Sequence, residues 1–143
     1  FNNIRTNAAR CQRLVPFTQL AGDLVSAATT PNFVWITPNM CNDMHDCAIG
    51  TGDAWLKTSL PPLFNSPAWQ TQSSALFIVG DEDDRFSNNQ VALIVVSPLA
   101  KHGYQSRARY DHYSLLKTIE SAWGLAALTA NDSNASPLSD FWK

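Results

Sequence analysis

Residues Pro38–Cys47 read Pro-Asn-Met-Cys-Asn-Asp-Met-His-Asp-Cys and follow the apolar or β-branched run Phe33–Thr37. A buried strand that ends in a polar loop closed by a disulfide is a common way to build a functional site. The alternative is a solvated turn held by a local disulfide, because Asp and Asn are ordinary turn residues. Cys41 and Cys47 are close enough in sequence to pair, and the polar residues of the stretch are Asn39, Asn42, Asp43, His45 and Asp46.

Outward from this stretch, apolar spacing predicts helices before and after it. Pro16 suits a first helical turn, and an apolar face continues from Phe17 to Ala28, where Thr29-Thr30-Pro31 ends it. A strand over residues 32–37 leads into the cysteine-closed loop. A second helix begins near Thr51, and Pro61-Pro62 stops it.

Two further apolar runs predict buried strands, and a third helix follows them. The strands cover residues 75–79 and 91–96. Asp111 caps a helix that ends at Gly124. Residues 1–13, 65–74 and the tail from Ala130 show no clear period. Strands between helices indicate an α/β fold with a sheet covered on both faces.

Two polar clusters follow predicted strands, where open α/β sheets bind ligands, and a third opens a predicted helix. Besides the cysteine-closed loop, they are Asp81-Glu82-Asp83-Asp84 and Asp111-His112. Carboxylates and imidazoles of this kind are ligands for hard divalent metals or zinc, which polarise phosphoryl oxygens. The alternatives are a solvated acidic turn and a capping turn with an exposed histidine. His102 has no acidic neighbour and is expected at the surface.

Composition limits the compartment and the partners. The chain has 143 residues, 45% of them hydrophobic, and its net charge of −2 gives no basic surface for nucleic acid. No apolar run approaches the roughly 20 residues that span a bilayer. A secreted glycoprotein is favoured by the three cysteines, of which Cys11 is left over, and by the sequons at Asn131 and Asn134. The alternative is a cytosolic domain with three free thiols. The start at Phe1 suggests processing or truncation.

Three stretches together resemble the phosphoesterase family of the alkaline phosphatase superfamily, which includes fungal acid phosphatases and bacterial phospholipases C. They are residues 32–56, ending in Gly-Asp-Ala-Trp-Leu; the acidic run at 81–84; and Tyr-Asp-His-Tyr-Ser-Leu-Leu-Lys-Thr-Ile-Glu at 110–120, followed by Trp123-Gly-Leu125. The motifs are most similar to those of the fungal acid phosphatase branch.

The resemblance implies a secreted, metal-dependent hydrolase of phosphate esters with a three-layer α/β/α sandwich of alkaline phosphatase-like type. Residues 1–143 would form the C-terminal portion of its phosphoesterase domain. Its divalent metal ion, of unknown identity, and its phosphate-ester substrate would meet residues that match the family motifs. The implied metal ligands are Asp43, His45, Asp46, Asp81, Glu82 and His112, of which His45 and His112 are also the catalytic candidates.

Two departures from the family pattern limit what the resemblance implies. Val79-Gly80 replaces the usual Thr-Trp before the Asp-Glu pair, which alters the pocket edge. The family's N-terminal half, with a Glu-Asn metal site and the Ser or Thr nucleophile, has no match. We therefore expect that segment or chain as a partner, and with it the partner of Cys11. The alternatives are a catalytically inactive secreted fragment that binds metal or a partner, and a structural domain whose polar clusters are turns.

Overall fold

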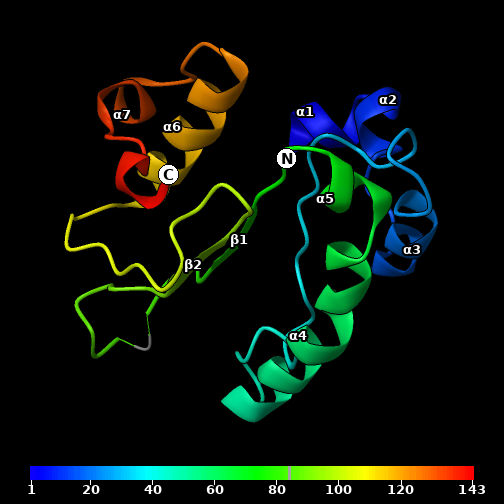
Figure 1. Cartoon of the computed structure of the whole chain (residues 1–143), viewed down its shortest axis with the longest axis horizontal. Helices are drawn as coiled ribbons and strands as arrows, with labels where there is room; N and C mark the ends of the chain where they lie inside the picture. The colour runs from blue at the N-terminus through cyan, green and yellow to red at the C-terminus, as the bar shows by residue number, and fades with distance from the viewer. Residues whose placement is uncertain (84) are drawn as a thin grey trace. The chain divides into compact units, whose positions relative to one another are not determined.

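The computed structural model describes residues 1–83 and 85–143. The chain divides into two compact units, Phe1–Gln72 and Ser73–Lys143, which we call unit 1 and unit 2. Unit 1 is helical, and unit 2 contains a two-stranded sheet with helices (Figure 1). This mixture agrees with the predicted α/β class, whereas the three-layer sandwich stays a prediction.

Unit 1 holds one long helix and several short ones. They are α1 (Asn2–Arg5), α2 (Ala8–Cys11), η1 (Phe17–Gln19, a 3-10 turn), α3 (Leu20–Asp23), α4 (Ile49–Phe64) and α5 (Pro67–Thr71). Its buried hydrophobic residues are Leu24 and Ala68, and the partly exposed rings of Phe17 and Trp55 contact each other with centroids 5.4 Å apart. The short α1, α2 and α5 lie where the sequence shows no helical period.

The helix predicted to start at Pro16 is shorter than expected. It consists of η1 and α3 and ends at Asp23. The hydroxyl groups of Thr29 and Thr30 each donate to the Asp23 carbonyl oxygen (both 3.0 Å). Side-chain hydrogen bonds of this kind offer the backbone an alternative to a continued helix, so the apolar spacing up to Ala28 overestimates its length.

The predicted strand over residues 32–37 is wrong, because this stretch has no regular secondary structure. Phe33 and Trp35 have ring centroids 6.5 Å apart, as expected for alternate residues on one side of an extended chain. Trp35 Nε1 donates to Thr37 Oγ1 (3.2 Å). The strand-like composition is local, but a strand also requires a neighbour, which the described part of unit 1 does not supply.

The long helix α4 continues past the prolines that were expected to stop it. It begins at Ile49, contains Pro61 and Pro62, and ends at Phe64. Proline has a helical φ, but past the first turn it lacks a donor and its ring crowds the carbonyl group one turn earlier, so Pro61 and Pro62 weaken the last turns of α4 without ending the helix. The N–H of Asn65 still donates to the Pro61 carbonyl oxygen (3.0 Å).

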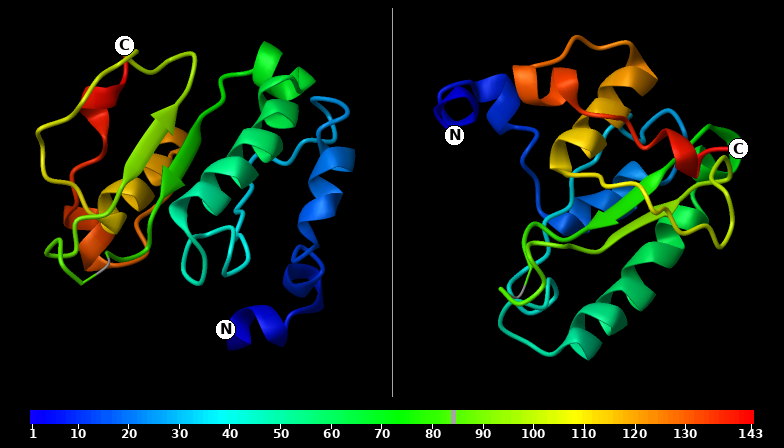
Figure 2. Two further views of the ribbon diagram at one scale, coloured as in Figure 1. Left: turned by 90° about the horizontal axis from the view of Figure 1, so that it is seen from below. Right: turned by 90° about the vertical axis from the view of Figure 1, so that its left-hand side faces the viewer.

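Unit 2 contains an antiparallel pair of strands, β1 (Leu76–Val79) and β2 (Leu93–Val96). Leu76 pairs with Val96, and Val79 pairs with Leu93. Both apolar runs are therefore strands, as predicted, although each is slightly shorter and only partly buried. Figure 2 shows α6 (His112–Trp123) on one side of this ribbon.

The helix α6 has the ends that the sequence predicts. The Asp111 carboxylate accepts from the N–H of Ser114 (2.9 Å), and Ser114 Oγ accepts from the N–H of Asp111 (3.3 Å), which is a capping box. Gly124 has a left-handed backbone with φ 62°. The tail is more regular than expected, with α7 (Ala130–Asn134) and the 3-10 turn η2 (Ser139–Phe141).

The Asp140 carboxylate ties the C-terminal segment to the loop after β2. It accepts from the hydroxyl groups of Tyr104 (2.9 Å), Ser106 (2.6 Å) and Tyr110 (2.7 Å). These donors lower the pKa of Asp140, while burial and the Asp140 charge raise the pKa of Tyr110 to about 12. Leu138, which is fully buried, anchors the same segment.

Candidate functional site

The predicted disulfide between Cys41 and Cys47 is confirmed, and it closes the loop after residue 37. Asn39 organises the loop from inside, a role that the sequence does not assign to it. Its Oδ1 accepts from the N–H groups of Cys41 (3.2 Å) and Asn42 (2.9 Å). An Asn whose side chain accepts from the backbone N–H groups two and three residues later forms an Asx turn. The Pro38-Asn39 pair is the sequence signal from which this turn could have been predicted.

His45 and Asp46 form a hydrogen-bonded pair in this loop. His45 Nδ1 lies 2.8 Å from Asp46 Oδ1, and the two side chains are 65% and 58% exposed. A carboxylate can only accept, so Nδ1–H donates and the neutral imidazole has its lone pair on Nε2. Asp43 fixes the backbone of the pair, because its Oδ1 accepts from the N–H of His45 (2.9 Å).

The disulfide-closed loop packs against the first turns of α4 at Gly52. Gly52 is the one buried residue of that helix. A Cβ atom there would lie 2.5 Å from Met44 Cγ and 3.0 Å from the carbonyl oxygen of Asn42. Met44 itself has a positive φ of 75°. The close approach of loop and helix therefore requires glycine at position 52, which places His45 near the start of α4.

The acidic run after β1 contains two kinds of carboxylate. Asp81 and Glu82 are exposed, and Asp81 Oδ1 accepts a local hydrogen bond from the N–H of Glu82 (3.0 Å). The Asp83 carboxylate accepts from the N–H groups of Arg85, Ser87 and Asn89, at 2.8 to 2.9 Å. These bonds, that of Asn89 foremost, lower the pKa of Asp83. Asp84 lies outside the described residues.

His112 links the start of α6 to the end of β1. Its Nε2 lies 2.8 Å from the backbone carbonyl oxygen of Asp81. A carbonyl oxygen only accepts, so Nε2–H donates and the lone pair of the neutral ring is on Nδ1. Of the predicted site residues, the structure thus brings His112 to the backbone of Asp81 in unit 2, and joins Asp43, His45 and Asp46 in unit 1.

These residues suit a divalent metal ion by type but do not form a complete site. Their carboxylate oxygens and imidazole nitrogens are appropriate donors. Within the parts of the chain that the structure describes, no three His, Cys, Asp or Glu side chains gather closely enough to hold an ion. The geometry therefore supports two histidines with fixed tautomers, each beside an acidic residue.

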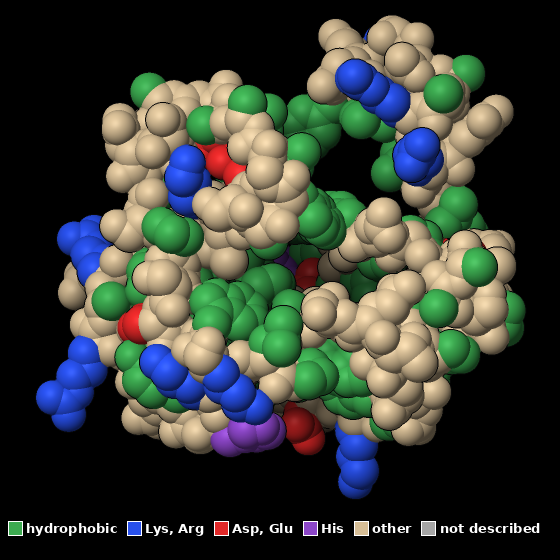
Figure 3. Space-filling view, turned by 45° about the horizontal axis from the view of Figure 1, so that its top comes forward, with side chains coloured by type: hydrophobic (Ala, Val, Ile, Leu, Met, Phe, Trp, Pro, Cys, Tyr) green, Lys and Arg blue, Asp and Glu red, His purple; other side chains and the backbone are tan. Residues whose placement is uncertain are grey.

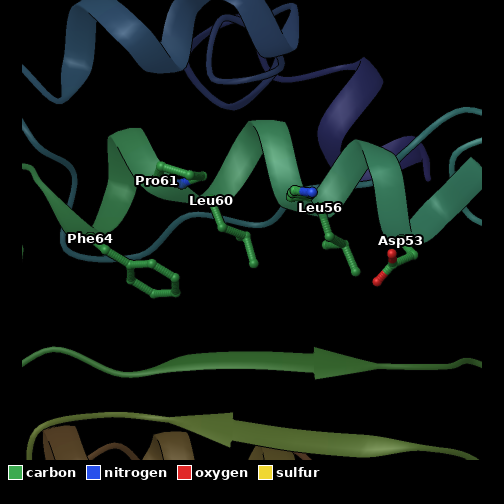
Figure 4. Close-up of a pocket in the computed structure, with 6 residues that line it drawn as sticks. Asp53, Leu56, Leu60, Pro61 and Phe64 are labelled. Atoms are coloured by element: carbon green, nitrogen blue, oxygen red, sulfur yellow. The ribbon is translucent and has the colours of Figure 1, made fainter.

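One side of α4 carries an apolar groove. Figure 4 shows Leu56, Leu60 and Phe64 pointing to the same side of the helix, with Asp53 toward its N-terminal end.

Two residues outside the candidate site are exposed: the free cysteine Cys11 and, as predicted, His102. Among the described residues, no helix has both the length and the apolar character needed to cross a membrane.

Comparisons with known proteins agree on one family. The model of the Phosphoesterase family matches residues 2–126. The chain is 36% identical to a phosphatidylinositol-3-phosphatase of Mycobacterium tuberculosis over 113 residues, which are 78% of this chain and 36% of that protein. It is 29% identical to an acid phosphatase of Aspergillus fumigatus over 142 residues, 96% of this chain and 31% of that protein.

A phosphate-repressible acid phosphatase of Penicillium chrysogenum is 31% identical over 142 residues, which cover 96% of this chain and 34% of the relative. The chain thus spans about a third of the length of these curated relatives. No solved structure matches it significantly. The family match includes the disulfide-closed loop, the acidic run and the start of α6, so the chain belongs to the Phosphoesterase family.

Proposed function

We propose that residues 1–143 form the C-terminal portion of a phosphoesterase domain that hydrolyses phosphate esters, as an acid phosphatase-like phosphomonoesterase. The observation that carries this proposal is the family match over residues 2–126, which contains both candidate histidines. Relatives named acid phosphatase, which align with 96% of the chain, support a monoester as the substrate.

His45 and His112 are the proposed catalytic residues, because a neighbouring acceptor fixes the orientation of each ring. Asp46 holds His45 with its lone pair on Nε2, and the Asp81 carbonyl oxygen holds His112 with its lone pair on Nδ1. In the protonated state, such a histidine can donate a proton to the leaving alcohol oxygen when the P–O bond breaks. In that protonated state, the second N–H group of the ring can also bind a phosphate oxygen.

Two further components belong to the proposal and come from outside the geometry of this chain. A Ser or Thr nucleophile is supplied by an N-terminal segment of the same protein or by another chain. The second component is a divalent metal ion, for which Asp43, His45 and Asp46 of unit 1 and Asp81, Glu82 and His112 of unit 2 are the candidate ligands. The donor chemistry of these six residues supports the metal, which would stabilise charge on the phosphoryl oxygens.

We also propose that the protein is secreted. The Cys41–Cys47 disulfide supports an oxidising compartment. The sequon residues Asn131 and Asn134 are both exposed on α7, which supports glycosylation there.

The proposed activity is tested with the full natural protein that contains this chain. Purified protein is assayed with an aryl phosphate monoester and an aryl phosphate diester, first after treatment with a chelator and then with added Mg²⁺, Ca²⁺ or Zn²⁺. We expect hydrolysis of the monoester, loss of the rate after chelation, and recovery with at least one ion. A folded protein that hydrolyses neither ester under any of these conditions contradicts the proposal.

The role of His45 is tested by Asp46→Asn. The amide is neutral and can present its NH₂ group to Nδ1, which favours the opposite tautomer. We expect kcat/KM for the monoester to fall about 10- to 100-fold, as is usual when the partner of a functional histidine is lost. Asp23→Asn is the control, because that carboxylate accepts from Gln19 Nε2 (3.2 Å) on the short α3 region. Equal rates for the two variants would remove Asp46 from the mechanism.

A further inference from the structure

A buried carboxyl group lies on α6, on the same helix as His112. Glu120 is only 3% exposed, and neither of its side-chain oxygens has a hydrogen-bond partner among the residues that the structure describes. Burial of an ionised carboxylate without a partner is strongly unfavourable, because the charge loses its hydration and gains nothing in return. Such a group either finds a counter-charge or takes up a proton.

A second buried carboxyl group, Asp132 on α7, acts on the Glu120 side chain. The two helices pack against each other (Figure 1), and Asp132 is fully buried. Asp132 has the partners that Glu120 lacks. Its oxygens accept from the N–H of Leu128 (2.6 Å), from the N–H of Thr129 (2.8 Å) and from the Thr129 hydroxyl group. Donors of this kind stabilise the ionised form, and the Thr129 hydroxyl foremost lowers the pKa of Asp132 to about 2.

The partners of Asp132 decide which of the two groups carries a proton. Two ionised carboxylates repel each other and cannot form a hydrogen bond, whereas one proton turns the same pair into a donor and an acceptor. Because Asp132 is held ionised, the proton belongs on Glu120. Burial, and after it the adjoining Asp132, raise the pKa of Glu120, while Lys117 and the N–H of Leu128 act in the opposite direction.

We propose that Glu120 and Asp132 share one proton and form a proton-dependent clasp between α6 and α7, closed in acid and weakened as the pH rises. The C-terminal segment is also attached to α6, because the N–H of Leu138 donates to Thr118 Oγ1 (2.8 Å). Lys117 and Asp132 are the charged groups of the described residues that act on Glu120.

The pH range of the clasp follows from the directions of the two pKa shifts. The pKa of Glu120 is above its ordinary value of 4.5, so its stabilising effect is complete below pH 4.5 and is lost as the pH rises through the folded-state pKa. The pKa of Asp132 is below its ordinary value of 3.8, so its effect is present above pH 3.8 and is lost as the pH falls toward about 2. The clasp is therefore most stable in mild acid.

The direct test is a carbon-13 NMR titration of the side-chain carboxyl groups in the full natural protein, with the Glu120 signal assigned by its loss in Glu120→Gln. We expect a midpoint for Glu120 above 4.5, with no titration of Asp132 in the same range. A midpoint at or below 4.5 overturns the proposal. This measurement requires no substrate, so its outcome is independent of the proposed activity.

The effect on stability is tested by urea unfolding of wild type and Glu120→Gln between pH 4.5 and pH 8. The glutamine keeps a donor toward Asp132 but cannot ionise. We expect the urea midpoint of the wild type to fall toward higher pH, and that of Glu120→Gln to depend less on pH. Asp53→Asn, at an exposed position of α4, is the control. The proposal is overturned if the urea midpoints of wild type and Glu120→Gln change with pH in the same way. If Glu120→Gln does not fold, the carbon-13 titration of the wild type decides, with the Glu120 signal assigned by sequential NMR assignment of the isotope-labelled protein.

Discussion

Asp81 and Asp83 are two residues apart in one acidic run, yet their carboxylates have different partners. The Asp83 carboxylate accepts from three backbone N–H groups of the following turn, whereas the exposed Asp81 carboxylate accepts from the N–H of its neighbour Glu82. The sequence does not distinguish the acidic residues of this run, because the hydrogen-bond partners of each carboxylate depend on how the chain turns after β1. Asp83 thus shapes the turn, and Asp81 remains the better candidate for substrate or metal binding.

We predict that Asp81→Ala in the full natural protein lowers phosphatase activity by orders of magnitude. The bond from His112 goes to the backbone carbonyl oxygen of Asp81, which alanine retains. The variant therefore removes the carboxylate without releasing His112. Steady-state rates, bound metal and the thermal unfolding midpoint are measured together. Asp83→Ala is the comparison, and it should reduce the unfolding midpoint. A normal rate and metal content in Asp81→Ala would show that this carboxylate has no role.

At the scale of elements, the disulfide-closed loop and α4 depend on glycine where they touch. We predict that Gly52→Ala destabilises the protein by about 1–3 kcal/mol, the usual cost of inserting a group into a packed contact. The new Cβ would approach Met44 and the backbone of Asn42. Gly50→Ala is the matched control on the same helix, because nothing lies within 4 Å of its Cβ position.

The two alanine variants should therefore differ in sign. Alanine has the higher helix propensity, so Gly50→Ala is expected to be neutral or stabilising by up to about 1 kcal/mol. Urea unfolding of both proteins measures the difference. If Gly52→Ala is as stable as Gly50→Ala, the loop does not pack on α4 as described.

The elements that the sequence predicts well are those with local signals. Asp111 and Gly124 mark both ends of α6 by their own chemistry, and β1 and β2 are adjacent apolar runs that pair with each other. Residues 32–37 have the composition of a strand, but pairing depends on distant residues. Among the candidate site residues, His45 and Asp46 were predicted from a sequence motif. The Glu120–Asp132 pair has no sequence signal, because a Glu within a helix is normally expected to be exposed to solvent.

At the scale of the whole molecule, the chain exposes many large apolar side chains. Phe33, Trp35, Ile94 and Leu128 are between 51% and 77% exposed, and apolar groups are scattered over the face seen in Figure 3. The buried hydrophobic residues are few, and the chain spans about a third of its curated relatives. Both observations support the proposal that further residues of the protein cover this surface and complete the active site.

The last prediction concerns the 143 residues alone, for which we expect no turnover of a phosphate monoester. In the proposed function, His45 and His112 orient phosphate and transfer protons, whereas the Ser or Thr nucleophile is supplied from outside these 143 residues. Loss of a nucleophile typically lowers the rate by several orders of magnitude, because binding and electrostatics catalyse only weakly by themselves. The purified chain is assayed with an aryl phosphate, with and without divalent metal, beside the full natural protein. Metal-dependent turnover at the rate of the full protein, with a single chain of the expected mass in the sample, would show that the chain carries a complete active site.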